Sequence, residues 1–258
     1  MKKLHFLYRT TFRFDDPVYN HSFALRCIPP NNNVQKIWIE KRHIRPADSI
    51  DEMMDGFGNH RYIGHIGGYH DSFEYEVSGI AWVNGMQVVK EKLNPIYKYP
   101  SKYTRYEENL IKYYKQIKPQ QGDSMQRGIE LMHAIYRNFV YEGGVTDVET
   151  TAAQALALGK GVCQDYAHIL IALCRLNNIP ARYVVGLMIG EGFTHAWVEI
   201  FVGDGWYGLD PTNDLLVNDY YIKIAHGRDY EDCIVDKGLF YGQTVQHQEV
   251  YVNVCEAE

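Results

Sequence analysis

The stretch "GKGVCQDYAHILIALCRLNNIP", residues 159–180, places a cysteine directly after a glycine-rich turn and ahead of an apolar run. Residues 169–176 are mostly apolar with helical spacing, and the sequence Asn–Asn–Ile–Pro at 177–180 ends that pattern. The spacing predicts that Cys163 lies in the first turn of a helix. Free backbone N–H groups and the positive end of the helix dipole favour a thiolate at that place. A buried structural cysteine would show the same local pattern, so other parts of the chain have to decide.

The composition is that of a globular protein, with 258 residues, 46% hydrophobic and 22% charged. A net charge of −6 with both signs scattered argues against a nucleic acid or an anionic membrane as partner. The beginning, "MKKLHFLYRTTFRFDD", lacks the apolar run of a signal peptide, and no stretch approaches the roughly 18 apolar residues of a membrane helix. The five cysteines are odd in number and widely spaced, which indicates free thiols and a reducing cytoplasm.

Residues 1–95 are predicted to form an antiparallel, sandwich-like β domain. Apolar and polar residues alternate in short runs between the turn sequences "DDP", "DGFGN" and "VNG". The predicted strands are "HFLYRTTFRF", "FALRCIPP", "KIWIEKRHIRP", "RYIGHIGG", "FEYEVSGIAWV" and "MQVVK".

The second part of the chain is predicted to be α+β, with helices packed on a mostly antiparallel sheet. Residues 96–120 are interpreted as a linker and a first helix, and residues 121–258 as the core. Ser124 is the expected N-cap of a second helix, and Gly159 the expected left-handed cap that ends a third. The predicted strands are "ARYVVGLMI", "HAWVEIFV", "GWYGLD" and "EVYVNV".

A thiol nucleophile needs a base within reach and a group that orients the base. His195 opens the strand "HAWVEIFV", and Asp210 closes the next strand across the "GDG" turn at 203–205. Antiparallel pairing about that turn brings the two residues together, with a small mismatch in register for a bulge to absorb. Cys163, His195 and Asp210 are therefore predicted to converge, with the thiol and the imidazole largely as an ion pair.

The same three motifs carry a family resemblance. "GVCQDYAHILIALCRLNNIPARYVVG", "THAWVEIF" and "GWYGLDPTND" resemble the bacterial transglutaminase-like proteins of the papain-like superfamily, and "GRDYEDC" at 227–233 is similar too. The strand-rich first part is similar to the β domain that often precedes this core in bacteria. The resemblance implies a papain-like/transglutaminase-like core in which Cys163 is the nucleophile, His195 the base and acid, and Asp210 the orienting group.

Three more residues are candidates for the site. The backbone N–H of Cys163 is one expected oxyanion donor, because it lies beside the nucleophile at the helix start. Tyr141, from its place in the family-like segment, is the candidate for a second donor, with Gln164 as its rival. Trp197, two residues after the histidine on one strand face, is either a wall of the site or a core residue.

His168 is the competing base, but its offset of five residues on one helix points it about 140° away from Cys163. We expect it to pack or to support the helix. No paired Cys or His motif and no EF-hand loop is present in the sequence, so we expect no metal and no cofactor. The remaining thiols are expected to be small hydrophobic residues: Cys27, Cys174, Cys233 and Cys255.

These observations favour a thiol-dependent amide hydrolase, a cysteine protease or amidase, that acts on a peptide-type amide through an acyl-enzyme. The same triad would serve a transglutaminase if an amine instead of water accepted the acyl group. A third reading is a peptide- or glycan-binding module with a relic triad. The substrate within the amide class and the oligomeric state stay open.

Overall fold

In the computed structural model, which describes residues 1–85, 88–119 and 122–257, the amino-terminal region is built around one 24-residue strand, β1 (Lys2–Leu25). Every second residue of β1 from Leu4 to Phe14 is buried, which is the alternation that predicts a half-buried strand. Its first half pairs antiparallel with β5 and β15, and its second half with β4 and β14. The other strands of the first part are β2 (Gln35–Arg45), β3 (Ser49–Met54), β4 (His60–Ile66) and β5 (His70–Val83).

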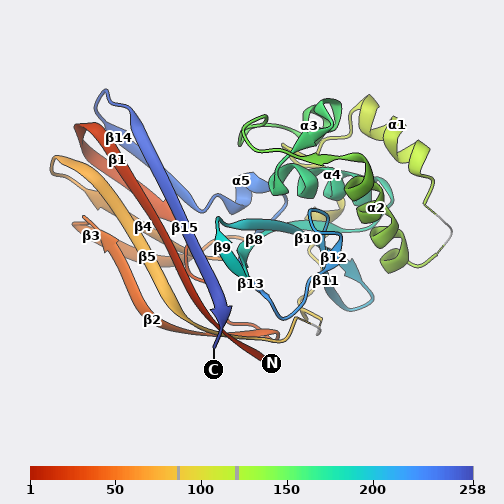
Figure 1. Cartoon of the computed structure of the whole chain (residues 1–258), viewed down its shortest axis with the longest axis horizontal. Coiled ribbons are helices and arrows are strands. Elements are labelled where there is room, and N and C mark those ends of the chain that lie inside the picture. The colour runs from red at the N-terminus through yellow and green to blue at the C-terminus, as the bar shows by residue number, and fades with distance from the viewer. Residues whose placement is uncertain (86–87, 120–121, 258) are drawn as a thin grey trace.

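The two halves of this eight-stranded sheet fold over each other, as Figure 1 shows on its left side. Phe23 from the second half of β1 packs on Phe73 of β5, with ring centroids 4.7 Å apart. The sandwich-like arrangement is therefore confirmed. The turn predicted at "DDP" is wrong, because β1 continues through residues 15–17 while its register with β5 shifts between Arg13 and Val18. The predicted strand "MQVVK" falls partly on residues 86–87, outside the described residues, and Val89 forms a single bridge to Trp206.

The last two strands, β14 (Asp236–Tyr241) and β15 (Gln246–Glu256), belong to this first sheet. β15 pairs with β1 from Leu4 opposite Glu256 to Phe14 opposite Gln246. The predicted extent of the core, residues 121–258, stays a prediction, and its last two strands pair with β1 of the first sheet. Pairing between the two ends of the chain leaves no local trace in the sequence. The boundaries predicted at residues 120–121 and 258 lie outside the described residues.

The core is a five-stranded antiparallel sheet in the order β12–β11–β10–β8–β13, with the helices stacked on one face (Figure 1). This is the predicted α+β arrangement. Its helices are α1 (Glu108–Ile117), α2 (Ser124–Asn138), α3 (Ala152–Leu158), α4 (Cys163–Leu176) and the short α5 (Tyr230–Cys233), with the 3-10 turn η1 (Pro95–Lys98) before them. Its strands are β8 (Ala181–Met188), β10 (His195–Val202), β11 (Gly205–Asp210), β12 (Leu215–Leu216) and β13 (Tyr221–Gly227), of which the last two were not predicted.

Local capping follows the sequence with one exception. Gly159 ends α3 with φ of 70°, and Gly203 turns the β10–β11 hairpin with φ of 64°, as predicted. The N-cap of α2 is Asp123 instead of Ser124, because the Asp123 side chain accepts a hydrogen bond from the backbone N–H of Gln126. None of the helices in the described ranges has the length and apolar character needed to cross a membrane.

Candidate active site

Helix α4 begins with Cys163, as the sequence predicts. The turn before it is held by Asp165, whose carboxylate accepts hydrogen bonds from the backbone N–H of Val162 (2.8 Å) and the hydroxyl of Thr146 (2.7 Å). Burial raises the pKa of Asp165 although these donors oppose the shift. A Cβ on Gly161 would lie 2.4 Å from this carboxylate, so only glycine fits there. The sequence "GVCQD", braced by Thr146, thus forms the turn that sets the cysteine at the helix start.

The β10–β11 hairpin brings His195 and Asp210 together. Val198 pairs with Leu209, so Asp210 lies opposite Trp197 and diagonally from His195, on the same face of the sheet. The His195 Nε2 atom and the Asp210 Oδ2 atom are 2.7 Å apart. The small mismatch in register predicted from the sequence is this diagonal offset, and no bulge interrupts the hairpin pairing from Val198 to Val202.

The carboxylate of Asp210 is fully buried and accepts several further hydrogen bonds. Its Oδ2 atom accepts from the side-chain amide of Asn213 and from the hydroxyl of Tyr221, both at 2.8 Å. Its Oδ1 atom accepts from the backbone N–H of Thr212 at 2.9 Å. Sequence reasoning missed Asn213 and Tyr221. The sequence "DPTND" held a signal for the first, since Asn three residues after Asp is typical of a turn.

Charge at the site is set by these contacts. Burial opposes a charged imidazole, but hydrogen bonds to Asp210 and Cys163 and their negative charge raise the pKa of His195 to about 10. Burial likewise opposes a charged Asp210, yet the hydrogen bond and charge of His195 keep the pKa of that carboxyl below its ordinary value. Because Nε2 of His195 bonds Asp210, its Nδ1 atom is left for the thiol. The arrangement holds a charged imidazole against a sulfur atom.

Cys163 and His195 line one surface cleft of about 230 Å³. Tyr141, at the end of β6 (Val140–Tyr141), lines the same cleft, while the Gln164 amide donates to the Val148 carbonyl at 3.2 Å. The other walls are residues 188–194 and Val252 of β15, so the amino-terminal sheet borders the cleft. β9 (Gly190–Gly192), within that loop, pairs antiparallel with β15 (Figure 1).

Trp197 lies behind the cleft instead of along it. Its side chain is buried, its ring packs at 5.5 Å against Tyr221, and it lies 6.4 Å from the His195 ring. It is not among the described residues that line the cleft. Trp197 therefore backs His195 from the core side.

His168 is a buried packing residue, as the sequence predicts. Its ring lies between Tyr103 and Tyr183, each 5.3 Å away between centroids, and its Nε2 atom accepts from the backbone N–H of Tyr230 at 3.2 Å. Burial, and then the charge of Arg175, lowers the pKa of His168 to about 3. The neutral ring therefore ties the middle of α4 to segment 227–233.

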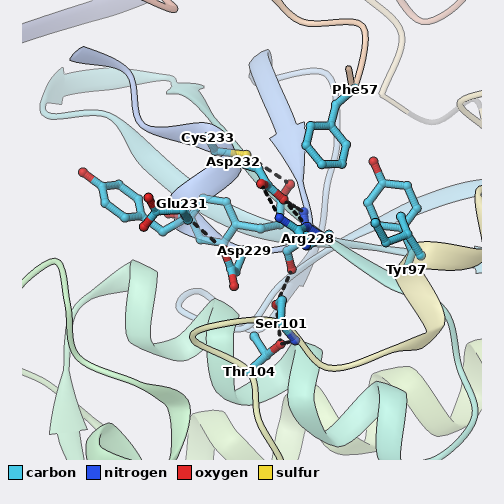
Figure 2. Close-up of polar contacts among 12 residues, drawn as sticks. Phe57, Tyr97, Ser101, Thr104, Arg228, Asp229, Glu231, Asp232 and Cys233 are labelled. Carbon is cyan, nitrogen blue, oxygen red and sulfur yellow. Dashed lines mark hydrogen bonds and ion pairs between the residues drawn. The ribbon is translucent and has the colours of Figure 1, made fainter. Parts of the chain in front are cut away.

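Segment 227–233, "GRDYEDC", holds the carboxyl end of α4 and does not reach the cleft. The carboxylate of Asp232 accepts two hydrogen bonds from the Arg228 guanidinium, at 2.8 and 2.9 Å, and this pair lies beside the ring of Phe57 (Figure 2). The backbone carbonyl of Arg228 accepts from Arg175 of α4 at 2.8 Å and from Ser101 at 3.4 Å. These contacts join α4, the linker and the amino-terminal sheet.

A helix that begins with a cysteine, packed on an antiparallel sheet that carries a His–Asp pair, defines the papain-like class of thiol proteins. Residues 111–211 match the transglutaminase-like superfamily, and residues 4–81 match the bacterial transglutaminase-like N-terminal region. Together the two matches span more than half of the chain. The chain belongs to the bacterial transglutaminase-like proteins.

Known proteins resemble the chain at two levels. The crystal structure of "a Putative Cysteine Protease from Cytophaga hutchinsonii" superposes with a TM-score of 0.80, over 100% of this chain and 92% of that protein's chain. The two sequences are 23% identical, so the similarity is one of fold. "Uncharacterized protein ML0607" of Mycobacterium leprae is 37% identical over 124 residues, 44% of either chain. "Uncharacterized protein Rv2569c" of Mycobacterium tuberculosis is 38% identical over 128 residues, 43% of this chain and 41% of its own. This chain thus spans less than half the length of these two relatives.

Proposed function

We propose that the chain is a thiol-dependent amide hydrolase that cleaves a peptide-type amide through an acyl-enzyme. The observation that carries the proposal is the position of His195, between a buried carboxylate and a thiol at a helix start, in one open cleft. A pKa of about 10 keeps its imidazole charged at neutral pH, which favours the thiolate of its partner.

In the first half of the reaction, the sulfur of Cys163 attacks the carbonyl carbon and forms a C–S bond. The C–N bond then breaks, and the leaving amine takes a proton from Nδ1 of His195. In the second half, neutral His195 accepts a proton from water, which attacks the thioester and releases the acid and the thiolate. Asp210 holds the ring in place and stabilises its charged form throughout.

The developing oxyanion needs donors beside the sulfur. The backbone N–H of Cys163 at the first position of α4 is one. Tyr141 is the better second candidate, because it lines the cleft with Cys163 while the amide of Gln164 is directed to Val148.

Hydrolysis is preferred over transamidation because the cleft is open to water. Tyr141 and Phe193 at its rim are 59% and 75% exposed, and water competes for a thioester unless a site excludes it. Transfer to an amine would need an acceptor bound beside the acyl group.

The proposal is tested with peptide, glutamine side-chain and peptidoglycan-type amides, each with and without added hydroxylamine. We expect the wild type to release free acid and Cys163→Ala to release none. Cys255→Ala is the matched control, because it removes the exposed thiol on β15 and leaves the cleft intact. Hydroxamate as the main product at low hydroxylamine would favour acyl transfer to amines. Binding without turnover, equal in wild type and Cys163→Ala, would favour a binding module and contradict the proposal.

A further inference from the structure

A second cavity lies inside the amino-terminal sheet, away from the cleft of Cys163. It has a volume of about 140 Å³, is partly open to solvent, and is lined by residues of β1, β5, β14 and β15. A cavity of about 150 Å³ lined by apolar side chains is known to admit one benzene-sized ring. The space is therefore that of a small ligand with a single ring or a short branched chain.

Four phenylalanine rings form one part of its wall, beside polar residues. Phe12, Phe14, Phe23 and Phe73 all line it, and the ring of Phe73 contacts Phe12 at 6.0 Å and Phe23 at 4.7 Å between centroids. Such faces bind apolar groups, and their negative π-electron density also attracts cations.

One polar group of the wall is His21, whose tautomer follows from its neighbours. Nδ1 of His70 lies 3.1 Å from the Gly68 carbonyl, which can only accept, so that nitrogen carries the proton. With the His70 proton on Nδ1, its Nε2 atom is the acceptor for the Nδ1–H group of His21, 3.1 Å away. Nε2 of His21 is left unprotonated, near Gly238 on the cavity wall. Burial lowers the pKa of His21 to about 4, so this acceptor persists at neutral pH.

The other polar group is Asp236 of β14. Its carboxylate accepts from the hydroxyl of Tyr75 at 2.8 Å and from the amide of Gln248 at 3.2 Å. Within residues 1–85, 88–119 and 122–257, no Lys, Arg or His forms an ion pair with it. Lys237 also borders the cavity, but its side chain is exposed and its charge acts on Glu231. A mostly buried carboxylate without a cation is costly, and a cationic ligand would relieve that cost.

We propose that this cavity binds a small protonated amine with a ring-sized apolar body. The ammonium group donates to Asp236 and to Nε2 of His21, and the apolar body lies against the phenylalanine rings. The ligand class follows from complementarity: two acceptors, one of them an unpaired carboxylate, in a cage of aromatic faces. This site is separate from Cys163 and does not depend on the function proposed for the cleft.

The test is calorimetric titration of the full chain with benzylammonium, and with benzyl alcohol as the neutral molecule of nearly the same shape. We expect saturable binding of benzylammonium at one site, at least about tenfold tighter than the alcohol, because only the cation gains the charge-assisted hydrogen bond. Cys163→Ala should bind it equally, which separates this site from the cleft.

Two variants locate the site. Asp236→Asn should reduce the preference for the amine over the alcohol to below about threefold, whereas Asp71→Asn, an exposed carboxylate at the start of β5, should leave it unchanged. Gly238→Ala should block binding, since the new Cβ would lie 2.7 Å from Nε2 of His21. If either variant fails to fold, the comparison of amine and alcohol on the wild type still decides. Equal affinity for the two ligands, or no binding of benzylammonium at millimolar concentration, overturns the proposal.

Discussion

The start and the middle of helix α4 each lie beside a histidine, and the two histidines are in opposite electrostatic settings. At its start, His195 faces Asp210 and Cys163, and the pKa of the imidazole is raised to about 10. Along its middle, His168 is packed between tyrosine rings with a backbone N–H donor at Nε2, and its pKa is lowered to about 3. Burial alone lowers the pKa in both places.

The partner therefore decides the charge of each histidine. A carboxylate that is itself held by several donors reverses the effect of burial at His195, whereas the positive charge of Arg175 adds to the effect of burial at His168. The histidine beside the start of α4 is thus charged and faces the cleft, whereas the histidine in the middle of α4 is neutral and structural.

The largest expected effect is on turnover. Once a substrate is identified, Cys163→Ala or His195→Ala should lower kcat by at least about a thousandfold, since each removes a group that makes or breaks bonds. His168→Gln should keep kcat per folded molecule within about threefold, because that ring does not reach the cleft. Steady-state kinetics, corrected for the folded fraction by circular dichroism, measure this contrast. A His168→Gln protein that is folded yet as inactive as His195→Ala would break the comparison.

Asp210→Asn should have an intermediate effect. It removes the negative charge and the tautomer control but leaves the nucleophile, so we expect a loss of roughly 10²–10⁴ in kcat with measurable activity remaining. Because Asp210 raises the pKa of His195, the alkaline limb of the pH profile of kcat/KM should move to lower pH in this variant. An unchanged alkaline limb would mean that the carboxylate does not set the charge of the ring.

The pH dependence of stability should have opposite signs for the two histidines. Since the pKa of folded His168 lies below the ordinary value of 6.5, its contribution is present above pH 6.5 and is lost as pH falls toward about 3. The pKa of folded His195 lies above that value, so its contribution is present below pH 6.5 and is lost as pH rises toward about 10.

Urea denaturation across this range checks the two signs. His168→Gln should also lower the free energy of unfolding by about 1–3 kcal/mol at pH 7, because it disturbs a buried hydrogen bond. Relative to the wild type, it should flatten the acid side of the profile, and His195→Gln the alkaline side. Identical profiles for the two variants would refute the assignment of opposite shifts.

The smallest expected effect concerns the border between the amino-terminal sheet and the cleft. Gly190 of β9 has φ of 113° and pairs with Val254 of β15, so Gly190→Ala should strain this ladder by about 1–2 kcal/mol. Gly203→Ala, in the remote β10–β11 turn at φ of 64°, is the matched control for backbone strain. We expect only the first to raise KM, by a few-fold, with kcat little changed. Equal KM values would show that the ladder does not shape the cleft.

The parts predicted from the sequence are those set by neighbouring residues. The start of α4 at Cys163 and the β10–β11 hairpin follow from local periodicity and turn residues, and the hairpin alone aligns His195 with Asp210. What escaped prediction depends on distant segments. β15 pairs with β1 from the other end of the chain, and Tyr221 donates a hydrogen bond to Asp210 from another strand. No local sequence pattern around these residues indicates either contact. Pro17 favours a turn, because proline has no backbone N–H to donate to a neighbouring strand. In the structure it lies within β1, where the pairing of β1 with β5 shifts in register.

The most direct test of the central claim compares two thiols of one chain and needs no substrate. Cys163 is half-buried beside a charged imidazole, and Cys255 is exposed at the end of β15. With one equivalent of iodoacetamide at pH 6, peptide mapping by mass spectrometry should find Cys163 alkylated at least about tenfold faster than Cys255, and this advantage should vanish in His195→Ala. If Cys255 reacts as fast as Cys163 in the folded wild type, Cys163 is not an activated nucleophile, and the account of the cleft is wrong.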